Sequence, residues 1–390
     1  MKIIHLCVCG EFYEEYAYQD NLLPKYHRKA GHDVSIIAAT YSRFDQKTGK
    51  VIRDNCKEKF LADGTKVIRL KPVLPLFLNS HVHCFWGMRK VINKEKPDLI
   101  FAHGLECPNY LYLSRYKNKF PNVKIVFDNH TDFQNSLHSP ITRFWAYNVV
   151  GKIIVKHLLW TSNKFYGTTP VRQAFLTDVY GVPVEKTDFL PFGADDEKMH
   201  LESREELREI VRREYGIKEK DFLIVTGGKI DKKKNIHKLV EAVNEIGNPN
   251  LFILVFGSIV NEMKPIFDEL KSDHFIYVGW IPSDGVYKFF YAADLVAFPG
   301  LHSVMWEQAV AARVPTAFSE IEGFKHVDIG GNCIFFKETC AVYYKTVIEK
   351  VLNDKDYYSK LKNCSMSNKA EIFLYSHVAD KVIKDAENQL

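Results

Sequence analysis

Lysine side chains follow one glycine pair closely enough to bind a phosphorylated ligand. Residues 226–234 read Thr-Gly-Gly-Lys-Ile-Asp-Lys-Lys-Lys and come directly after an apolar run. The glycines allow a backbone to approach a ligand, and lysine ammonium groups can neutralise a diphosphate. The spacing is not that of a P-loop, which requires Gly-x4-Gly-Lys-Ser/Thr. Lys232 and Lys233 are typical of a solvated turn, whereas Lys229 and Lys234 are the better candidates for diphosphate binding.

A second segment, residues 299–315, combines a turn with a short helix. It reads Pro-Gly-Leu-His-Ser-Val-Met-Trp-Glu-Gln-Ala-Val-Ala-Ala-Arg-Val-Pro. We expect Ser303 to cap a helix that starts at Val304, with amides free to bind an anion. Glu307 would then lie one turn into the helix. Its carboxylate could accept hydrogen bonds from ribose hydroxyls, or it could complement the helix dipole as a first-turn acid.

His130 ends a strand-like run that begins at Val123. A histidine just past the carboxyl end of a parallel strand faces the crevice where such sheets bind ligands. Its imidazole, with a pKa near neutrality, can hydrogen-bond a sugar hydroxyl or a leaving phosphate. The alternative is an ordinary polar role, because the chain contains fifteen histidines.

A further segment is apolar at Pro72–Leu78 and then aromatic and basic over residues 81–90. It could contact a membrane surface or a lipid-linked acceptor, and burial in loop packing is the alternative. His81 and His83 share one strand face, but no third metal ligand accompanies them.

The sequence predicts no bound metal and no cofactor. The only close cysteine pair, Cys7 and Cys9, lies in an apolar strand, and a zinc site needs four suitably spaced ligands. The only Asp-x-Asp, Asp354–Asp356, opens a helical segment instead of ending a strand, so we interpret it as a solvated helix start. Reduced cysteines fit a cytoplasmic protein.

Length and charge restrict the function classes. The 390 residues suit two α/β domains, and a hydrophobic content of 46% supports sizeable cores. A net charge of +5 fits anionic small molecules but is too weak for a nucleic-acid-binding surface. The start lacks a signal-peptide cleavage pattern, and no apolar run reaches the roughly 18 residues of a membrane span. We expect a soluble, cytoplasmic protein that contacts at most the inner face of the membrane, with its oligomeric state undetermined.

Apolar β-rich runs alternate with helical patterns in both halves, which is typical of parallel sheets with right-handed crossovers. Strands are expected at Ile3–Cys9, Val34–Ala39, Val67–Leu70, Leu99–Ala102, Val123–Phe127, Phe165–Gly167, Phe222–Thr226, Leu251–Phe256, Phe275–Val278, Leu295–Phe298, Thr316–Phe318 and Cys333–Phe335. The clearest helices are Asn21–Ala30, Ile236–Ile246 and Asp284–Ala292, and residues 356–390 also have a helical pattern.

The two halves join around residues 193–215, where a charged helix at Glu202–Glu214 precedes a new strand–helix series. We predict an α/β fold with two Rossmann-like domains. The first spans residues 1–198 and is completed by a C-terminal helix at about 370–390, and the second spans residues 199–369. Such sheets bind ligands at the carboxyl ends of their strands, so facing domains would share one cleft.

Taken in order, these segments resemble the retaining glycosyltransferases of family 4, which have the GT-B fold. The resemblance extends nearly from end to end. Its markers are Gly10, residues 18–26, 31–34 and 96–104, His130, Leu190–Asp195, Gly227–Lys229, Lys234–Ile236, Val278–Ile281, Ala293–Leu295 and Trp306–Ala311.

The resemblance implies that the second domain binds the nucleotide and the first presents the acceptor. Lys229 and Lys234 would neutralise the donor diphosphate and Glu307 would bind the ribose. His130 would lie near the reacting sugar. The remaining residues placed around the donor are Gly10, Gly227, Gly228, Gly257, Trp280, Ile281, His302, Ser303 and Val304.

The sequence departs from the family at one glutamate. The family pattern Glu-x7-Glu would put its first glutamate at Pro299. His302 or Ser303 would then contact the transferred sugar instead. Gly10 also stands alone where many members have two glycines.

These features predict a retaining, metal-independent glycosyltransferase. It would move a hexose or N-acetylhexosamine from a nucleoside-diphosphate sugar to a glycan or lipid-linked acceptor, as in cell-surface polysaccharide synthesis. One alternative is an epimerase that acts on the nucleotide sugar itself. Another is a non-catalytic relative that binds a nucleotide sugar, which the missing glutamate favours.

Overall fold

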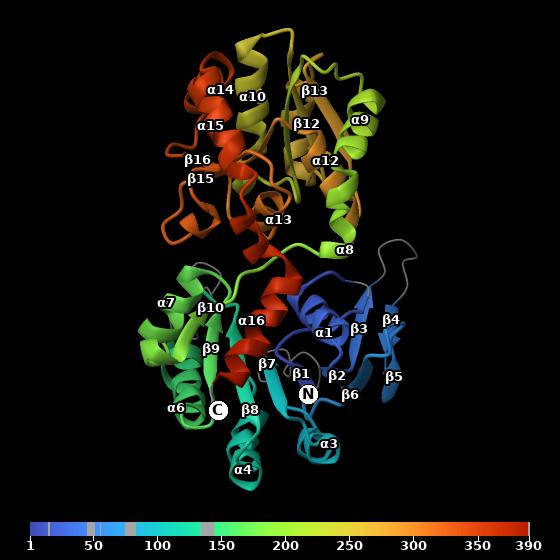
Figure 1. Cartoon of the computed structure of the whole chain (residues 1–390), viewed down its shortest axis with the longest axis vertical. Coiled ribbons are helices and arrows are strands. Elements are labelled where there is room, and N and C mark those ends of the chain that lie inside the picture. Colours follow the sequence, from blue (N-terminus) through green and yellow to red (C-terminus); the bar gives the residue numbers. More distant parts are fainter. Residues whose placement is uncertain (15, 45–50, 55, 75–82, 134–143, 389–390) are drawn as a thin grey trace. The chain divides into compact units, whose positions relative to one another are not determined.

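The computed structural model describes the chain except for residues 15, 45–50, 55, 75–82, 134–143 and 389–390. The described residues form two compact units (Figure 1). Unit 1 comprises Met1–Pro191 and Val378–Leu390, and unit 2 comprises Phe192–His377. Each unit has its own sheet and its own buried core.

Unit 1 contains an eight-stranded sheet in the order β10-β9-β8-β7-β1-β2-β6-β5. Its neighbours are parallel except β5, which pairs antiparallel with β6. The strands are β1 (Lys2–Cys7), β2 (Asp33–Ala39), β5 (Glu58–Phe60), β6 (Lys66–Leu70), β7 (Leu99–His103), β8 (Lys124–Asn129), β9 (Lys164–Gly167) and β10 (Thr187–Phe189). A separate hairpin joins β3 (Tyr41–Phe44) to β4 (Val51–Asp54).

Helices cover this sheet on both faces, so its central strands are apolar without alternation. They are α1 (Gln19–Lys29), α3 (Met88–Glu95), α4 (Leu111–Lys119), α6 (Lys152–Leu158) and α7 (Pro170–Asp178), with short turns η1 (Pro108–Tyr110) and η3 (Val184–Lys186) and a π-helix, η2 (Phe144–Gly151). Helix α1 ends before Gly31, whose φ of +87° suits a glycine that terminates a helix.

Unit 2 contains a six-stranded parallel sheet in the order β13-β12-β11-β14-β15-β16. The strands are β11 (Phe222–Gly227), β12 (Leu251–Phe256), β13 (Phe275–Gly279), β14 (Leu295–Phe298), β15 (Thr316–Ser319) and β16 (Cys333–Phe336). The helices are α8 (Asp196–Met199), α9 (Arg204–Glu214), α10 (Ile236–Ile246), α11 (Lys264–Glu269), α12 (Val286–Ala292), α13 (Met305–Ala311), α14 (Ala341–Asn353) and α15 (Lys355–Ser365). Short turns complete it: η4 (Leu201–Ser203), η5 (Lys232–Lys234), η6 (Asn261–Met263), η7 (Ser283–Gly285), η8 (Lys325–Val327) and η9 (Asn368–Phe373).

The last helix, α16 (Tyr375–Glu387), begins in unit 2 and continues into unit 1. Within unit 1, Ala379 O lies 3.1 Å from His27 Nε2, and Tyr166 donates a hydrogen bond of 2.8 Å to Asp385. Lys381 Nζ lies 2.6 Å from Asp188 Oδ2. The C-terminal helix therefore packs on the N-terminal half, as the sequence predicts.

Each strand predicted from the sequence is present, with ends that differ by a few residues. The prediction missed β3, β4, β5 and β10, which are short and carry charged residues. The predicted C-terminal helical segment is broken into α15, η9 and α16. Asp354 accepts a hydrogen bond of 2.9 Å from Tyr357 N, which confirms that the Asp-x-Asp sequence starts a helix.

Both sheets contain a point where the direction of strand addition reverses. In unit 1 the reversal lies between β1 and β7, and in unit 2 it lies between β11 and β14. Loops that leave neighbouring strands on either side of such a point diverge and expose a crevice for ligands. Most of the predicted site residues lie at or after the ends of β1 and β8 in unit 1 and of β11 and β14 in unit 2, and the others, Gly257, Trp280 and Ile281, follow β12 and β13.

Candidate functional site

Three loops meet at the carboxyl ends of β12, β11 and β14 in unit 2. Their glycines pack against one another, because a Cβ at Gly257 would lie 1.9 Å from Gly228 O. A Cβ at Gly227 would lie 2.5 Å from the Phe256 ring, and one at Gly300 would lie 2.4 Å from Lys234 Cα. Gly228 and Gly257 also have φ near +112°, which other residues rarely adopt. Glycine is therefore required here for the loops to come together.

Lys234 is held against the loop that follows β14. Its ammonium donates a hydrogen bond of 2.7 Å to Leu301 O, and Asp231 caps the turn that carries it. Burial lowers the pKa of the Lys234 ammonium. Lys229 lies on the same loop, two residues after β11, and its side chain is exposed. One lysine is thus fixed beside residues 299–301 and the other faces solvent.

Glu307 lies at the centre of a buried polar cluster. Its Oε1 is 2.8 Å from His302 Nε2 and 2.8 Å from His326 Nε2, and the Glu307 side chain has no solvent exposure. Trp306 stacks on Phe318 of β15 at 4.5 Å between ring centroids, which fixes the helix that carries Glu307. Three separate segments of unit 2 therefore position one carboxylate.

The charge state of Glu307 follows from these contacts. Burial alone would raise the pKa of its carboxyl, but the two imidazoles outweigh burial and lower the pKa to about 2. The carboxylate is therefore ionised at neutral pH. Its second oxygen, Oε2, is buried and accepts no hydrogen bond from any described residue. A buried acceptor of this kind is costly unless a ligand supplies a donor.

The structure corrects the prediction for the start of this helix. Helix α13 begins at Met305, its N-cap residue is Val304, and no side chain caps it. Ser303 instead accepts a backbone hydrogen bond of 2.9 Å from Trp306 N through its carbonyl oxygen. The Ser303 hydroxyl cap was wrong because the chain makes one further turn before it becomes helical.

Trp280 and Ile281 follow β13, at the outer edge of the same carboxyl end. Trp280 is 65% exposed and Ile281 is half-buried. Because β13 pairs with β12, both residues follow the strand beside the one that ends before Gly257. Their contact with the donor stays a prediction.

In unit 1, His130 is brought together with residues that the sequence did not single out. Its Nε2 lies 3.1 Å from Asp128 Oδ1, while Asp128 Oδ2 lies 2.9 Å from His103 Nδ1. Burial lowers the pKa of His130, but Asp128 outweighs it and raises the pKa above the usual value. Gly10 lies in the loop after β1, and a Cβ there would meet no atom within 4 Å.

Sequence reasoning missed His326, Asp128 and His103 as functional candidates. Asp128 and His103 end adjacent parallel strands, so the rule that selected His130 could have selected them as well. His326 gave no such signal, because it lies in η8, several residues after β15.

Two groups of described residues could in principle hold a metal ion: Asp20, His103 and His130 in unit 1, and His302, Glu307 and His326 in unit 2. In each group the ligand atoms lie within 4.8 Å of one another. The first group is already joined by hydrogen bonds and ion pairs through Asp128. All eight cysteines are free thiols, and none belongs to either group.

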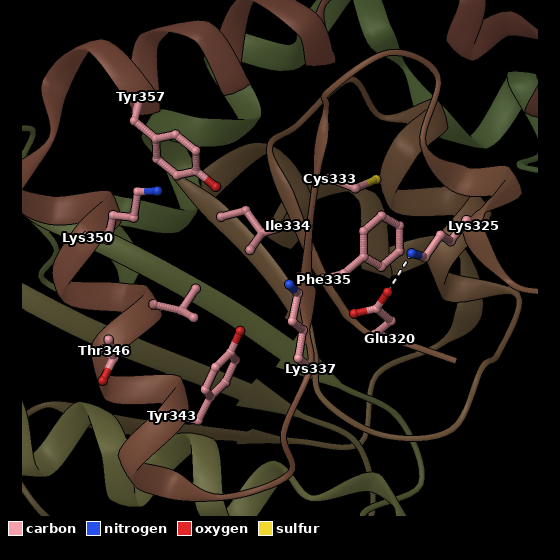
Figure 2. Close-up of a pocket in the computed structure, with 11 residues that line it drawn as sticks. Glu320, Lys325, Cys333, Ile334, Phe335, Lys337, Tyr343, Thr346, Lys350 and Tyr357 are labelled. Carbon is pink, nitrogen blue, oxygen red and sulfur yellow. Dashed lines mark hydrogen bonds and ion pairs between the residues drawn. The ribbon is translucent and has the colours of Figure 1, made fainter. Parts of the chain in front are cut away.

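A cavity of about 560 Å³ lies elsewhere in unit 2, between β16 and α14 (Figure 2). Lys325 pairs with Glu320, and Lys350 lies 4.3 Å from the centre of the Tyr357 ring. None of the residues predicted to bind a donor lines this cavity. We therefore place the candidate site at the carboxyl ends of β11 and β14.

Part of the predicted membrane-contact segment, including His81, lies outside the described residues. Among the residues that the structure covers, no helix has the length and apolar character needed to cross a bilayer.

Two family models match the chain one after the other. Glycosyltransferase Family 4 matches residues 22–198, and Glycosyl transferases group 1 matches residues 208–367. The chain is 19% identical over 369 residues to an uncharacterized glycosyltransferase of Methanocaldococcus jannaschii, covering 90% of this chain and 89% of that protein. It is 22% identical over 247 residues to the alpha-galactosylglucosyldiacylglycerol synthase of Streptococcus pneumoniae, covering 60% of this chain and 63% of that enzyme.

Solved structures share the fold over the whole chain. HepE of Anabaena in complex with UDP matches with a TM-score of 0.68 at 13% identity, covering 100% of both chains. Sucrose-phosphate synthase of Thermosynechococcus elongatus matches with a TM-score of 0.68 at 15% identity, covering 100% of this chain and 99% of that one. These structures show the GT-B fold, and the two family models, which match residues 22–198 and 208–367, identify the chain as a glycosyltransferase of the family 4 type.

Proposed function

We propose that this glycosyltransferase uses a nucleoside-diphosphate sugar as donor and transfers its hexose or N-acetylhexosamine with retention and without a metal ion. The observation that carries the proposal is the ionised, buried Glu307, whose Oε2 has no hydrogen-bond donor among the described residues. Ribose offers two adjacent hydroxyl donors for such an acceptor. UDP is the first nucleotide to test, because HepE, which shares the fold, binds UDP.

The lysines after β11 would stabilise the leaving group. When the bond between the sugar and the diphosphate breaks, negative charge grows on the nucleoside diphosphate. A cation already in place lowers the energy of that transition state because it need not reorganise. Lys234 is held in place by Leu301 O, and the exposed Lys229 of the same loop would contact the same phosphates. Removing one such interaction typically costs about 2.7–4 kcal/mol in the barrier.

His130 would act on the transferred sugar. Asp128 raises the pKa of His130, which favours the protonated form of its imidazole. A protonated imidazole can donate to a sugar hydroxyl or to the departing phosphate, which favours the charge that develops during transfer. The acceptor hydroxyl would attack from the face that the diphosphate leaves, which retains the anomeric configuration. The glycolipid synthase of Streptococcus pneumoniae is a reason to include lipid acceptors among the substrates to be tested.

Thermal melting with nucleotides and product analysis test this function together. UDP, GDP and their sugars are screened for an increase in Tm, and the stabilising donor is then incubated with glycan and lipid-linked acceptors. Transfer yields free nucleoside diphosphate and a heavier acceptor, with the donor's anomeric configuration kept. A donor that is only isomerised indicates an epimerase, and binding without turnover indicates a non-catalytic relative. No stabilisation by any of these nucleotides would rule the proposal out.

A further inference from the structure

Four histidines and one aspartate form a continuous line across the sheet of unit 1, which is buried except at His130, where it ends. His27 Nδ1 lies 3.0 Å from His5 Nε2, and His5 Nδ1 lies 3.0 Å from His103 Nε2. Asp128 then connects His103 to His130, at 2.9 and 3.1 Å. The side chains of His27, His5, His103 and Asp128 are all buried. The line crosses from α1 through β1 and β7 to β8, so it depends on the tertiary structure.

The ring nitrogen that carries the hydrogen can be derived for each histidine in turn, starting from His27 at one end of the line. His27 Nε2 lies 3.1 Å from Ala379 O, which can only accept, so that nitrogen carries a hydrogen. Burial lowers the pKa of His27 to about 3, so His27 is neutral and its Nδ1 is an acceptor. His5 must therefore donate through Nε2. Burial and the neighbouring imidazoles also lower the pKa of His5, which leaves its Nδ1 as an acceptor.

The same logic requires a positive charge on His103. It must donate through Nε2 to His5, yet its Nδ1 faces Asp128 Oδ2 at 2.9 Å and Asp20 Oδ1 at 3.2 Å. Carboxylate oxygens only accept, so both ring nitrogens carry hydrogens and the ring is an imidazolium. Burial lowers the pKa of His103, but the two carboxylates outweigh burial and raise the pKa well above the usual value. The geometry and the electrostatics therefore agree.

Asp128 transmits this charge to His130. One of its oxygens faces the His103 imidazolium, and the other accepts from Gly104 N at 2.9 Å and faces His130 Nε2. The carboxylate is thus fixed in position and ionised. His130 therefore keeps a hydrogen on Nε2 in both of its charge states, and its Nδ1 is the nitrogen that titrates. The other charged or titratable groups that face the line are Asp20, Cys7, His32 and Arg172.

We propose that His103, His5 and His27 are positioning residues for His130: the imidazolium of His103 fixes Asp128, which in turn sets the tautomer and the proton affinity of His130. His5 and His27 act indirectly. Because His5 Nδ1 is an acceptor, His103 must donate to it through Nε2 while it donates to Asp128 through Nδ1. The importance of His130 for sugar transfer rests on the proposed function. The arrangement of hydrogens along the line is derived from the contacts in unit 1 and does not depend on that function.

The arrangement predicts opposite effects of two substitutions. Asp128→Asn removes the negative charge beside His130, so His130 should bind its proton at least about tenfold more weakly. His103→Gln removes the positive charge that partly neutralises Asp128, so His130 should bind its proton more tightly. Mere structural support would not give opposite signs. His157→Gln is the matched control, because His157 lies in α6 of the same unit and is exposed.

Nuclear magnetic resonance of the full chain with 15N-labelled histidine rings measures these quantities directly. In the wild-type protein at pH 7 we expect neutral His27 and His5 with hydrogen on Nε2, and a doubly protonated His103. If His103 is neutral in the wild-type protein, the proposal is wrong. This measurement needs no variant, so the test remains decisive even if a variant fails to fold. Equal proton affinity of His130 in Asp128→Asn, His103→Gln and wild type overturns it as well.

The pH dependence of kcat/KM separates this inference from the proposed function. If the variants change the titration of the His130 resonances as expected, and the inflection in the pH profile of kcat/KM moves by the same amount, both the positioning role and the proposed function are supported. Should the resonances shift while the kinetic profile stays fixed, the positioning line stands and the role of His130 in transfer fails.

Discussion

His326 Nε2 lies 2.8 Å from Glu307 Oε1, although the two residues are separated by 19 positions and belong to different elements, η8 and α13. His302 Nε2 contacts the same oxygen at 2.8 Å, so one carboxylate oxygen is occupied twice while the other faces no donor. The two histidines therefore hold the Glu307 carboxylate in one orientation and leave its Oε2 as the atom that can accept a hydrogen bond from a ligand. The arrangement also gives the predicted nucleotide-binding residue a partner that the sequence did not indicate.

Glu307→Gln should reduce kcat/KM for the donor roughly a hundredfold, or about 2.7 kcal/mol. The amide cannot match the charge-assisted hydrogen bonds that the carboxylate accepts from the two histidines and from ribose. Steady-state kinetics and a circular dichroism spectrum check the loss and the fold together. Glu322→Gln, an exposed change in the same unit, is the control. Near-wild-type turnover in Glu307→Gln would remove this residue from the site.

Lys229→Ala should lower kcat by about a hundredfold or more with little change in Tm, because Lys229 is exposed and its loss leaves the packing intact. Lys232→Ala is a sharp control, since Lys232 is an exposed lysine only three positions away. Donor turnover and nucleotide-induced melting shifts are measured for both variants. Equal activity of the two variants would show that the diphosphate does not use Lys229.

Gly257→Ala should destabilise unit 2 by about 1–3 kcal/mol through backbone strain alone, since φ is +112°. The new Cβ would also lie 1.9 Å from Gly228 O, so the loop that carries Lys229 must shift and donor affinity should fall. Chemical denaturation and nucleotide binding measure the two effects. Gly285→Ala is the control, because its nearest contact would be an ordinary 3.6 Å to Pro282. A Gly257 variant as stable as this control would contradict the packing described above.

Acidification should destabilise the wild-type protein partly through His27. Burial lowers its folded-state pKa to about 3 from 6.5, so the unfolded chain takes up a proton first as the pH falls. The stabilisation is complete above pH 6.5 and declines towards pH 3, by up to about 1.4 kcal/mol per pH unit. Between pH 7.5 and 5.5, His27→Gln should therefore lose about 1.4 kcal/mol less free energy of unfolding than the wild type. If the free energy of unfolding of His27→Gln fell with decreasing pH as steeply as that of the wild type and of His157→Gln, His27 would not be buried in its neutral form.

Chelation should leave transfer intact. We expect that dialysis against EDTA changes kcat by less than about twofold, because the proposed function assigns the stabilisation of the leaving diphosphate to the lysines and not to a metal ion. Metal content by mass spectrometry accompanies the assay. Activity lost on chelation and restored by zinc, but not in His326→Ala, would instead assign His302, Glu307 and His326 as a metal site.

The sequence by itself was sufficient to locate most of the strands in each half and to indicate the family. Apolar runs such as Leu251–Phe256 determine the parallel strands, because both faces of such strands are buried. Local signals also identified the helix start at Asp354 correctly, since a helix start depends on neighbouring residues only. Lys229, Lys234 and Glu307 were selected because they lie in segments that follow strands, and their roles stay predictions.

The tertiary structure decided which of these residues meet. His326 joins Glu307, and His27 joins His5 and His103, only because separate strands and helices pack side by side. Such contacts depend on long-range packing and leave no short-range pattern in the chain. The charge on each imidazole is set by those same contacts and by burial, so proton positions could be derived only after the sheet of unit 1 was in place.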